Sequence, residues 1–136
     1  MANDSNRQPC RLLVVDDEAI VGKRLKQVFG KIGFHIESFT EPAAAVAAMS
    51  ANPFDIVVTD LKMEGMDGLQ VAQRTLAVNP AARVIIITGY ASPETAEAAR
   101  DCGVFAFLAK PFRLDELKEI IVRAMAAGGR DESAGR

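Results

Sequence analysis

The chain has few of the residues that mark several common classes of protein. Its 136 residues include two cysteines, one histidine and no tryptophan. Cys10 and Cys102 form neither a CxxC motif nor a Cys/His cluster, so neither a disulfide framework nor a zinc site is expected. His35, the only histidine, is predicted to be structural or to lie at the surface.

Long apolar runs and an excess of one charge are also missing. The apolar stretches are strand-length, far below the roughly 20 residues that cross a bilayer, and the start Met1–Asn6 carries no secretory hydrophobic region. We therefore expect no membrane span and a cytoplasmic location. Sixteen Lys and Arg against 18 Asp and Glu give a net charge of -2, so direct nucleic-acid binding by this chain is not expected.

What is present is an alternation of short apolar runs with helical patterns. The runs that read as strands are 12–15, 34–39, 56–59, 84–87 and 105–109. With right-handed crossovers, five such strand-helix units give an α/β (βα)5 fold whose parallel sheet is covered on both faces. The expected closure is a doubly wound, flavodoxin-like sheet of order 2-1-3-4-5, with the alternating run 34–39 at an edge.

Apolar spacing and capping residues predict the helices. The first helix should stop at Gly33, and its apolar face carries Val21, Leu25, Val28, Phe29 and Ile32. Thr40 should cap the second helix, and Ser92 should cap the fourth, whose thin apolar face predicts mobility. The last helix should run over 114–127 and bury Leu114, Leu117, Ile121, Ala124 and Met125.

The length of the chain favours a single domain. We expect this domain to span residues 11–127. Residues 1–10 are predicted to be a disordered lead. The polar segment 128–136 is predicted to be a disordered tail or the start of a linker.

Chemically active side chains directly follow four of the five predicted strands. Asp16 and Asp17 follow the first, Asp60 the third, Thr88 the fourth and Lys110 the fifth. Because the carboxyl ends of parallel strands meet at one edge of a sheet, these side chains should lie close together. Each could simply cap a turn or face solvent, but their joint placement favours a functional site.

Three carboxylates at one sheet edge would repel one another unless a cation were present. Oxygen ligands suit Mg²⁺, which commonly uses one or two carboxylates together with phosphate oxygens. We therefore expect Asp16, Asp17 and Asp60 to bind Mg²⁺, for which Mn²⁺ could substitute. A carboxylate can also attack phosphorus when metal and ammonium neutralise the transferring group. Asp60, alone at the end of the central third strand, is the predicted nucleophile.

Four segments carry a recognisable pattern: Leu12–Glu18, Asp60–Gly68, Ile87–Tyr90 and Phe107–Phe112. Together they resemble the CheY-like receiver domain of two-component response regulators. Position by position, the resemblance implies that Asp60 is the phosphoacceptor and that Asp16 and Asp17 form the metal-binding acid pair. It also implies that the main-chain carbonyl of Lys62 is the third protein ligand of Mg²⁺.

The resemblance assigns further roles beyond the acidic residues. Thr88 and Lys110 match the residues that contact the phosphoryl group, and Phe107 matches the switch aromatic, which turns inward as Thr88 moves. The Lys110–Pro111 bond matches one that is commonly cis in the family. Core packing is the alternative explanation for Phe107.

Two loop positions that flank the site also belong to the resemblance. Lys62 and Tyr90 match positions that tune dephosphorylation, although exposed loop residues would look the same. Many receivers have proline after the methionine of this loop, whereas Glu64 follows Met63 here. The loss of proline should loosen the loop slightly without removing a required ligand.

The resemblance implies a phosphoryl-accepting switch and no turnover enzyme, with catalysis limited to its own phosphotransfer and autodephosphorylation. The donor would be a sensor histidine kinase or a histidine phosphotransfer protein. The new charge would alter the surface of the fourth helix, fifth strand and fifth helix, which faces an unidentified effector, a linked output domain or a second copy in a phosphorylation-dependent homodimer.

Three other functions compete with this one. A phosphorylation-independent docking module on the same fold stays open. A haloacid-dehalogenase-type phosphohydrolase is disfavoured because Lys62 stands where a second Asp is needed. A flavin-binding electron carrier is disfavoured because no Ser/Thr-rich phosphate loop follows the first strand and an acid pair would repel the cofactor phosphate.

Overall fold

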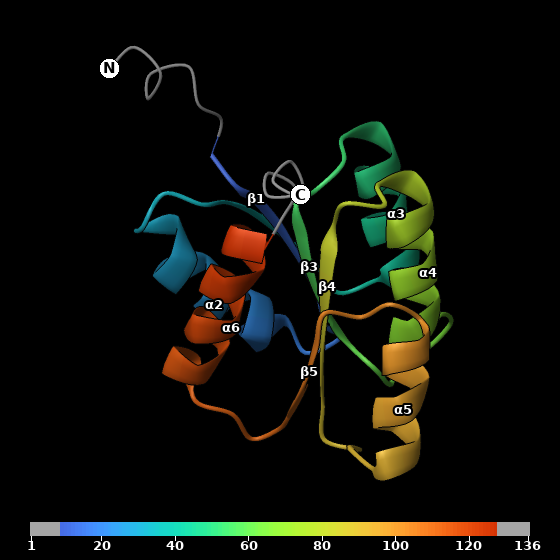
Figure 1. Ribbon diagram of the computed structural model, residues 1–136. Helices are drawn as coiled ribbons and strands as arrows, with labels where there is room; N and C mark the ends of the chain where they lie inside the picture. The colour runs from blue at the N-terminus through green and yellow to red at the C-terminus, as the bar shows by residue number, and fades with distance from the viewer. Residues whose placement is uncertain (1–8, 128–136) are drawn as a thin grey trace.

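Five parallel strands and five helices alternate along residues 9–127, the part of the chain described by the computed structural model (Figure 1). The strands are β1 (Arg11–Val15), β2 (His35–Phe39), β3 (Ile56–Asp60), β4 (Arg83–Thr88) and β5 (Ala106–Ala109). The helices are α2 (Ala19–Gly30), α3 (Pro42–Ala51), α4 (Gly68–Val78), α5 (Pro93–Asp101) and α6 (Leu114–Ala127). The sheet order β2-β1-β3-β4-β5 confirms the predicted doubly wound, flavodoxin-like fold.

The helices form a layer on each face of the sheet. Helices α2 and α6 cover one face, and α3, α4 and α5 cover the other (Figure 1). Because successive side chains along a strand point to opposite faces of the sheet, each strand contributes side chains to the cores under both helix layers. The strand residues toward α2 and α6 are Leu12, Val14, Ile56, Val58, Ile85 and Ile87. Those toward α3, α4 and α5 are Leu13, Val15, Val57, Val84 and Ile86.

Burial along the strands follows their place in the sheet. Every residue of β3 is buried, whereas His35 of β2 is exposed and the rest of that strand is half-buried. This confirms 34–39 as the location of an edge strand, with His35 at the surface. The central position of β3 brings its last residue, Asp60, between neighbours on both sides.

Helix α2 ends earlier than its apolar spacing suggests. Gly30 is its last residue, and the chain then turns through Gly33, whose φ of 100° suits glycine. The Phe34 amide donates to the Phe29 carbonyl across this turn, at 3.1 Å. Ile32 was expected on the buried face, but it lies in the turn and is 49% exposed, so that prediction is wrong.

The helix caps agree with the sequence in one case and differ in another. Ser92 and Thr95 form a reciprocal capping box at the start of α5, as expected for a Ser-Pro opening. Thr40 does not cap α3: the N-cap is Glu41, which makes no side-chain capping bond. Pro42 occupies the first helical turn and has no N–H to satisfy, so the need for a cap there is smaller.

The buried face of helix α6 is narrower than the sequence predicts. Its buried residues are Leu117, Ile120, Ile121 and Ala124. Met125 was expected among them but is 42% exposed, because it lies at the margin of this stripe. Met125 therefore adds little buried surface to the core.

The amino ends of the strands are linked by polar contacts at the edge opposite Asp60. The Arg11 amide donates to the Asp55 carboxylate at 2.9 Å, and the Arg83 amide donates to the Asp55 carbonyl at 2.9 Å. The Arg83 guanidinium also donates to the carbonyl of Ala127, the last residue of α6. This bond ties the end of α6 to the start of β4.

The predicted ends of the domain lie largely outside the described residues. Residues 1–8 of the expected lead and the whole expected tail, 128–136, are among those not described. Cys10, placed in the lead by the sequence, is half-buried and packs against the core under α2 and α6. Within residues 9–127, no helix has both the length and the apolar character of a membrane span.

Candidate functional site

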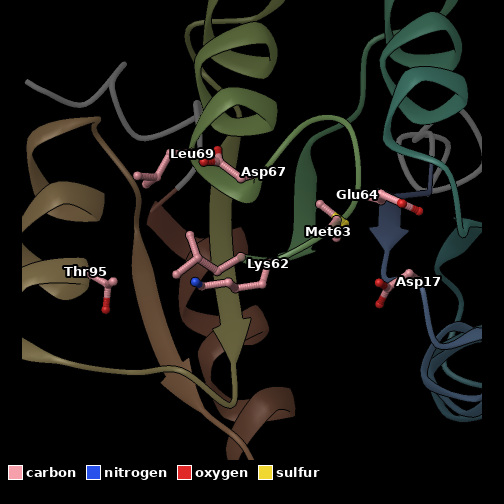
Figure 2. Close-up of a pocket in the computed structure, with 8 residues that line it drawn as sticks. Asp17, Lys62, Met63, Glu64, Asp67, Leu69 and Thr95 are labelled. Carbon is pink, nitrogen blue, oxygen red and sulfur yellow. The ribbon is translucent and has the colours of Figure 1, made fainter.

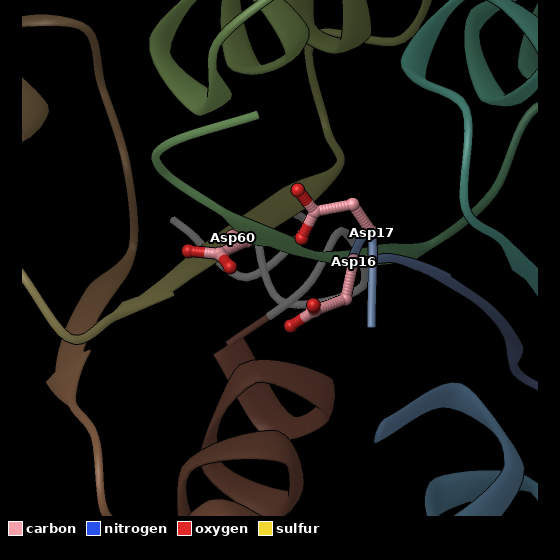
Figure 3. Close-up of side chains that lie close together, drawn as sticks. All are labelled: Asp16, Asp17 and Asp60. Carbon is pink, nitrogen blue, oxygen red and sulfur yellow. The ribbon is translucent and has the colours of Figure 1, made fainter. Parts of the chain in front are cut away.

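Three carboxylates gather where β1 and β3 end. One oxygen each from Asp16, Asp17 and Asp60 lies within 4.8 Å of the others (Figure 3). Asp16 and Asp60 are buried, at 2% and 7% exposure, whereas Asp17 is exposed. The adjacency of β1 and β3 in the sheet produces this cluster. Val15 pairs with Thr59, and the residues that follow them are Asp16 and Asp60.

Lys110 lies between two of these acids. Its ammonium donates to Asp16 Oδ2 at 3.0 Å and to Asp60 Oδ2 at 3.1 Å. Glu18 Oε1 is 3.6 Å from the same nitrogen. A single ammonium is therefore paired with three carboxylates, those of Asp16, Asp60 and Glu18, and a net negative charge remains at the site.

The electrostatics of the site reflect burial of like charges. Burial raises the pKa of Asp16, and the nearby Asp60 charge adds to this, while the Glu18 amide and Lys110 partly counteract it. Burial alone would lower the pKa of Lys110, but its hydrogen bonds and charge interactions with Asp16 and Asp60 more than offset this and raise it. Lys110 is thus held in its charged form.

The other Asp60 oxygen and the nearby main chain are also fixed. The Leu61 amide donates to Asp60 Oδ1 at 2.7 Å. The Gly68 amide donates to the Leu61 carbonyl at 2.8 Å, which folds the loop 61–67 back against the end of β3. Asp67 then caps α4 through a capping box with Gln70. The carboxylate of Asp60 is therefore held by Leu61 and Lys110 in a defined orientation.

Thr88 lies fully buried at the end of β4, next to β3. Its Oγ1 accepts the amide of Tyr90 at 3.0 Å, so its own O–H is left to donate elsewhere. The Lys110 amide donates to the Thr88 carbonyl at 2.8 Å. Thr88 and Lys110 are thus fixed to each other through the main chain.

A hollow of about 590 Å³ opens beside the acid cluster (Figure 2). Its wall includes Asp17, Lys62, Glu64 and Thr95. The Lys62 ammonium lies 5.2 Å from the centroid of the Tyr90 ring, which is 64% exposed. The two loop positions singled out in the sequence are therefore in contact with each other.

Two further residues named from the sequence flank this site. Phe107 is half-buried in β5, opposite Ile86, and packs against the core under α3, α4 and α5. The Lys110–Pro111 peptide bond is cis, the isomer that the resemblance implies. Neither Phe107 nor Pro111 belongs to the acid cluster.

Two residues of the site had no role assigned from the sequence. Glu18 approaches Lys110, and its amide donates to Asp16 Oδ1 at 2.9 Å. Gly68 lies against the Asp60 main chain with no room for a side chain. Glu18 directly follows the acid pair and Gly68 closes the loop motif, so both lay within recognised segments, but their contacts required the fold.

The donor set indicates the chemistry that the site can support. Three carboxylates supply oxygen ligands alone, which fits a hard divalent cation such as Mg²⁺ rather than zinc. A carboxylate held by an ammonium and an amide can attack an electrophile, and the buried hydroxyl can donate to it.

Comparison with known proteins agrees with this arrangement. Residues 12–122 match the family described as the response regulator receiver domain. The chain is 31% identical over 121 residues to the response regulator receiver protein CpdR of Brucella abortus, covering 86% of this chain and 98% of that protein. It is 34% identical over 113 residues to the C4-dicarboxylate transport transcriptional regulatory protein DctD of Rhizobium meliloti, covering 83% of this chain.

The coverage of these relatives differs. The chain spans only 25% of the length of the DctD regulator. Among solved structures, a CheY-like response regulator receiver domain protein from Methanospirillum hungatei superposes with a TM-score of 0.81 at 25% identity, covering 88% of this chain and 97% of that one. The matched residues 12–122 include the acid cluster and all of the sheet except Arg11, and the chain belongs to the response regulator receiver domain family.

Proposed function

We propose that the chain accepts a phosphoryl group on Asp60 and acts as a phosphorylation-controlled switch. The observation that carries this proposal is the ammonium of Lys110, which donates hydrogen bonds to both Asp60 and Asp16, at 3.1 and 3.0 Å. The carboxylate of Asp17 lies beside them. This combination suits in-line transfer, because a nucleophilic carboxylate meets a fixed positive charge where the phosphoryl oxygens would lie.

In the proposed step, an Asp60 oxygen forms a bond to phosphorus while the phosphorus–nitrogen bond of a donor phosphohistidine breaks. The other ring nitrogen of the donor carries a proton, and the electron pair of the broken bond stays with the ring, so the aspartyl phosphate and a neutral histidine result. Lys110 and the Thr88 hydroxyl would then stabilise the phosphoryl oxygens. Before transfer, the Leu61 amide orients the Asp60 carboxylate through its 2.7 Å bond.

The acid cluster would hold Mg²⁺, or Mn²⁺ in its place, through Asp16, Asp17, Asp60 and the main-chain carbonyl of Lys62. The oxygen-only carboxylates within 4.8 Å of one another support this choice. When bound, the ion would neutralise part of the charge of the carboxylates and the transferring group. Lys110, whose pKa is raised by Asp16 and Asp60, would remain charged and keep its hydrogen bond to Asp60.

The donor would be a sensor histidine kinase or a histidine phosphotransfer protein. The added charge would draw Thr88 toward Asp60, and Phe107 would turn inward behind it. The surface of α5, β5 and α6 would change as a result and engage an effector, a linked output domain or a second copy of the chain. The domain would turn over only its own phosphoryl group, without an external substrate.

Incubation with acetyl phosphate and Mg²⁺, followed by intact-mass measurement, tests the proposal. One phosphoryl increment is expected in the native chain, none in Asp60→Asn, and none when Mg²⁺ is removed by chelation. Asp101→Asn, a change at an exposed carboxylate at the end of α5, is the matched control and should be labelled normally. An adduct that persists in Asp60→Asn would contradict the assignment. Failure of the native chain to be labelled, even by a phosphohistidine donor, would favour a phosphorylation-independent docking module.

A further inference from the structure

Lys62 and Tyr90 join two loops on the β3–β4 side of the acid cluster. Lys62 follows the end of β3 by two residues, and Tyr90 follows the end of β4 by two residues. Asp60 pairs with Ile87 in the sheet, so the two loops leave from neighbouring points. The Lys62 side chain extends away from Asp17 toward the side of α5 and Thr95 (Figure 2). Its ammonium ends 5.2 Å from the Tyr90 ring centroid, within range of a cation–π interaction.

Tyr90 is also bonded to the hydroxyl of Thr88. Its amide donates to Thr88 Oγ1 at 3.0 Å. The same oxygen carries the O–H that the proposed phosphotransfer uses as a donor, so the direction of this bond sets where that O–H can point. The Tyr90 carbonyl accepts a long bond, 3.5 Å, from Thr95 Oγ1. Support from α5 is therefore weak, and the contact with Lys62 becomes important for holding Tyr90.

We infer that Lys62 is a positioning residue, which orients the Thr88 hydroxyl through Tyr90. This inference rests on the proposed phosphorylation of Asp60 and concerns how its donor group is aligned. The ammonium fixes the Tyr90 ring, the Tyr90 main chain fixes the Thr88 oxygen, and the Thr88 O–H is left directed at the phosphoryl group. Because Thr88 is fully buried while Lys62 is exposed, a surface side chain controls a group in the interior.

A direct effect of the Lys62 charge on the phosphoryl group is the competing explanation. The two can be separated because an indirect effect needs the aromatic ring, whereas a direct effect does not. If Lys62 acts through Tyr90, removing Lys62 after the ring has been removed should change nothing further. If Lys62 acts directly, its removal should slow the reaction equally in both backgrounds.

The first test uses the unphosphorylated chain, so it does not depend on the proposed function. Three-bond couplings to the Thr88 methyl carbon report the Thr88 rotamer. We expect one rotamer in the native chain and in Lys62→Arg, and rotamer averaging in Lys62→Met and Tyr90→Leu. Lys118→Met, which removes an exposed ammonium on α6, is the matched control and should keep one rotamer. Unchanged Thr88 couplings in Lys62→Met would overturn the inference.

The second test measures the rate at which acetyl phosphate labels Asp60. Lys62→Met and Tyr90→Leu should each slow labelling by about two- to fivefold, the range expected for an exposed cation–π contact. The double variant should be no slower than the slower single variant, and Lys62→Arg and Tyr90→Phe should recover most of the lost rate. Additive losses in the double variant would overturn the inference. If neither acetyl phosphate nor a phosphohistidine donor labels the native chain, the proposed function fails, and the Thr88 couplings alone decide the positioning role.

Discussion

Gly68 and Asp60 touch through their main chains, with no space for a side chain between them. A Cβ atom on Gly68 would lie 2.3 Å from the Asp60 carbonyl oxygen and 2.9 Å from the Leu61 Cα. Both neighbours are backbone atoms at the end of the central strand, so neither can move aside cheaply. The start of α4 therefore packs directly against the proposed phosphoacceptor.

Gly68→Ala should destabilise the fold and disturb Asp60. We expect a loss of about 1–3 kcal/mol in the free energy of unfolding, because overpacking against fixed main chain is costly. Urea unfolding measures it. Gly30→Ala is the matched control, since its added Cβ would meet no atom within 4 Å beyond its chain neighbours and the adjacent backbone of its own helix, and alanine in a helix should gain up to about 1 kcal/mol. Equal stability of the two variants would contradict the close contact.

Lys110→Ala should nearly abolish phosphorylation of Asp60. The change removes the shared donor of two buried carboxylates, which then repel each other and the incoming phosphoryl group. We expect the labelling rate with acetyl phosphate to fall by about 100-fold, a loss typical of one transition-state donor. Lys118→Ala serves as the control for loss of a surface ammonium. A Lys110→Ala rate within twofold of the native rate would remove Lys110 from the mechanism.

Addition of Mg²⁺ should raise the melting temperature by binding the acid cluster. At a concentration tenfold above its dissociation constant, a ligand of the native state adds about 1.4 kcal/mol, or about 5 °C for a domain of this size. Asp17→Asn should lose most of this gain, since it removes one of the three clustered carboxylates. Asp101→Asn should retain it, and NaCl of equal ionic strength should not reproduce it. Thermal unfolding that is identical with and without Mg²⁺ would argue against the site.

Native Cys10 should resist alkylation near pH 8. Burial, with a smaller contribution from Asp55, raises the pKa of its thiol from 9.0 to about 11. Mass spectrometry after iodoacetamide treatment should therefore show labelling on the order of tenfold slower or more in native chain than in urea-unfolded chain. The raised pKa also makes the free energy of unfolding depend on pH. The stability contributed by the neutral thiol is present below pH 9 and is lost as the pH rises toward 11. Equal alkylation rates in the two states would refute the shift.

Hydrogen exchange should be faster in α5 than in α2 or α6. Ala99 is the one fully buried residue of α5, whereas α6 buries four and α2 buries three. Small buried area gives a low free energy for local opening, so the amides of residues 94–101 in α5 should lose protection first among these helices. Comparable protection across the three helices would show that the Ser92 capping box compensates for the thin core contact.

The topology could be predicted from the sequence because its signals are local and repeated. Each apolar run is strand-length, and crossover handedness leaves few ways to arrange five such units. The same logic brought Asp16, Asp17 and Asp60 together, because parallel strands end at one edge. Lys110 was placed at that edge for the same reason.

What could not be predicted depends on side-chain direction and on exact element ends. The approach of Glu18 to Lys110 and the contact of Lys62 with Tyr90 follow from loop shapes that no spacing rule specifies. Ile32 and Met125 fit helical spacing, but α2 ends before the first and the buried stripe of α6 excludes the second.

The bond from Arg83 to the Ala127 carbonyl also bears on how the domain can be handled and joined to others. It holds the end of α6 at the amino edge of the sheet, the pole opposite the carboxylates. A dye, a bead or a fused protein attached beyond Ala127 would therefore be joined to the domain at the end of the sheet away from the acid cluster. The point of attachment and the acid cluster lie at opposite ends of the sheet. A group joined after Ala127 could therefore be replaced without altering the acid cluster.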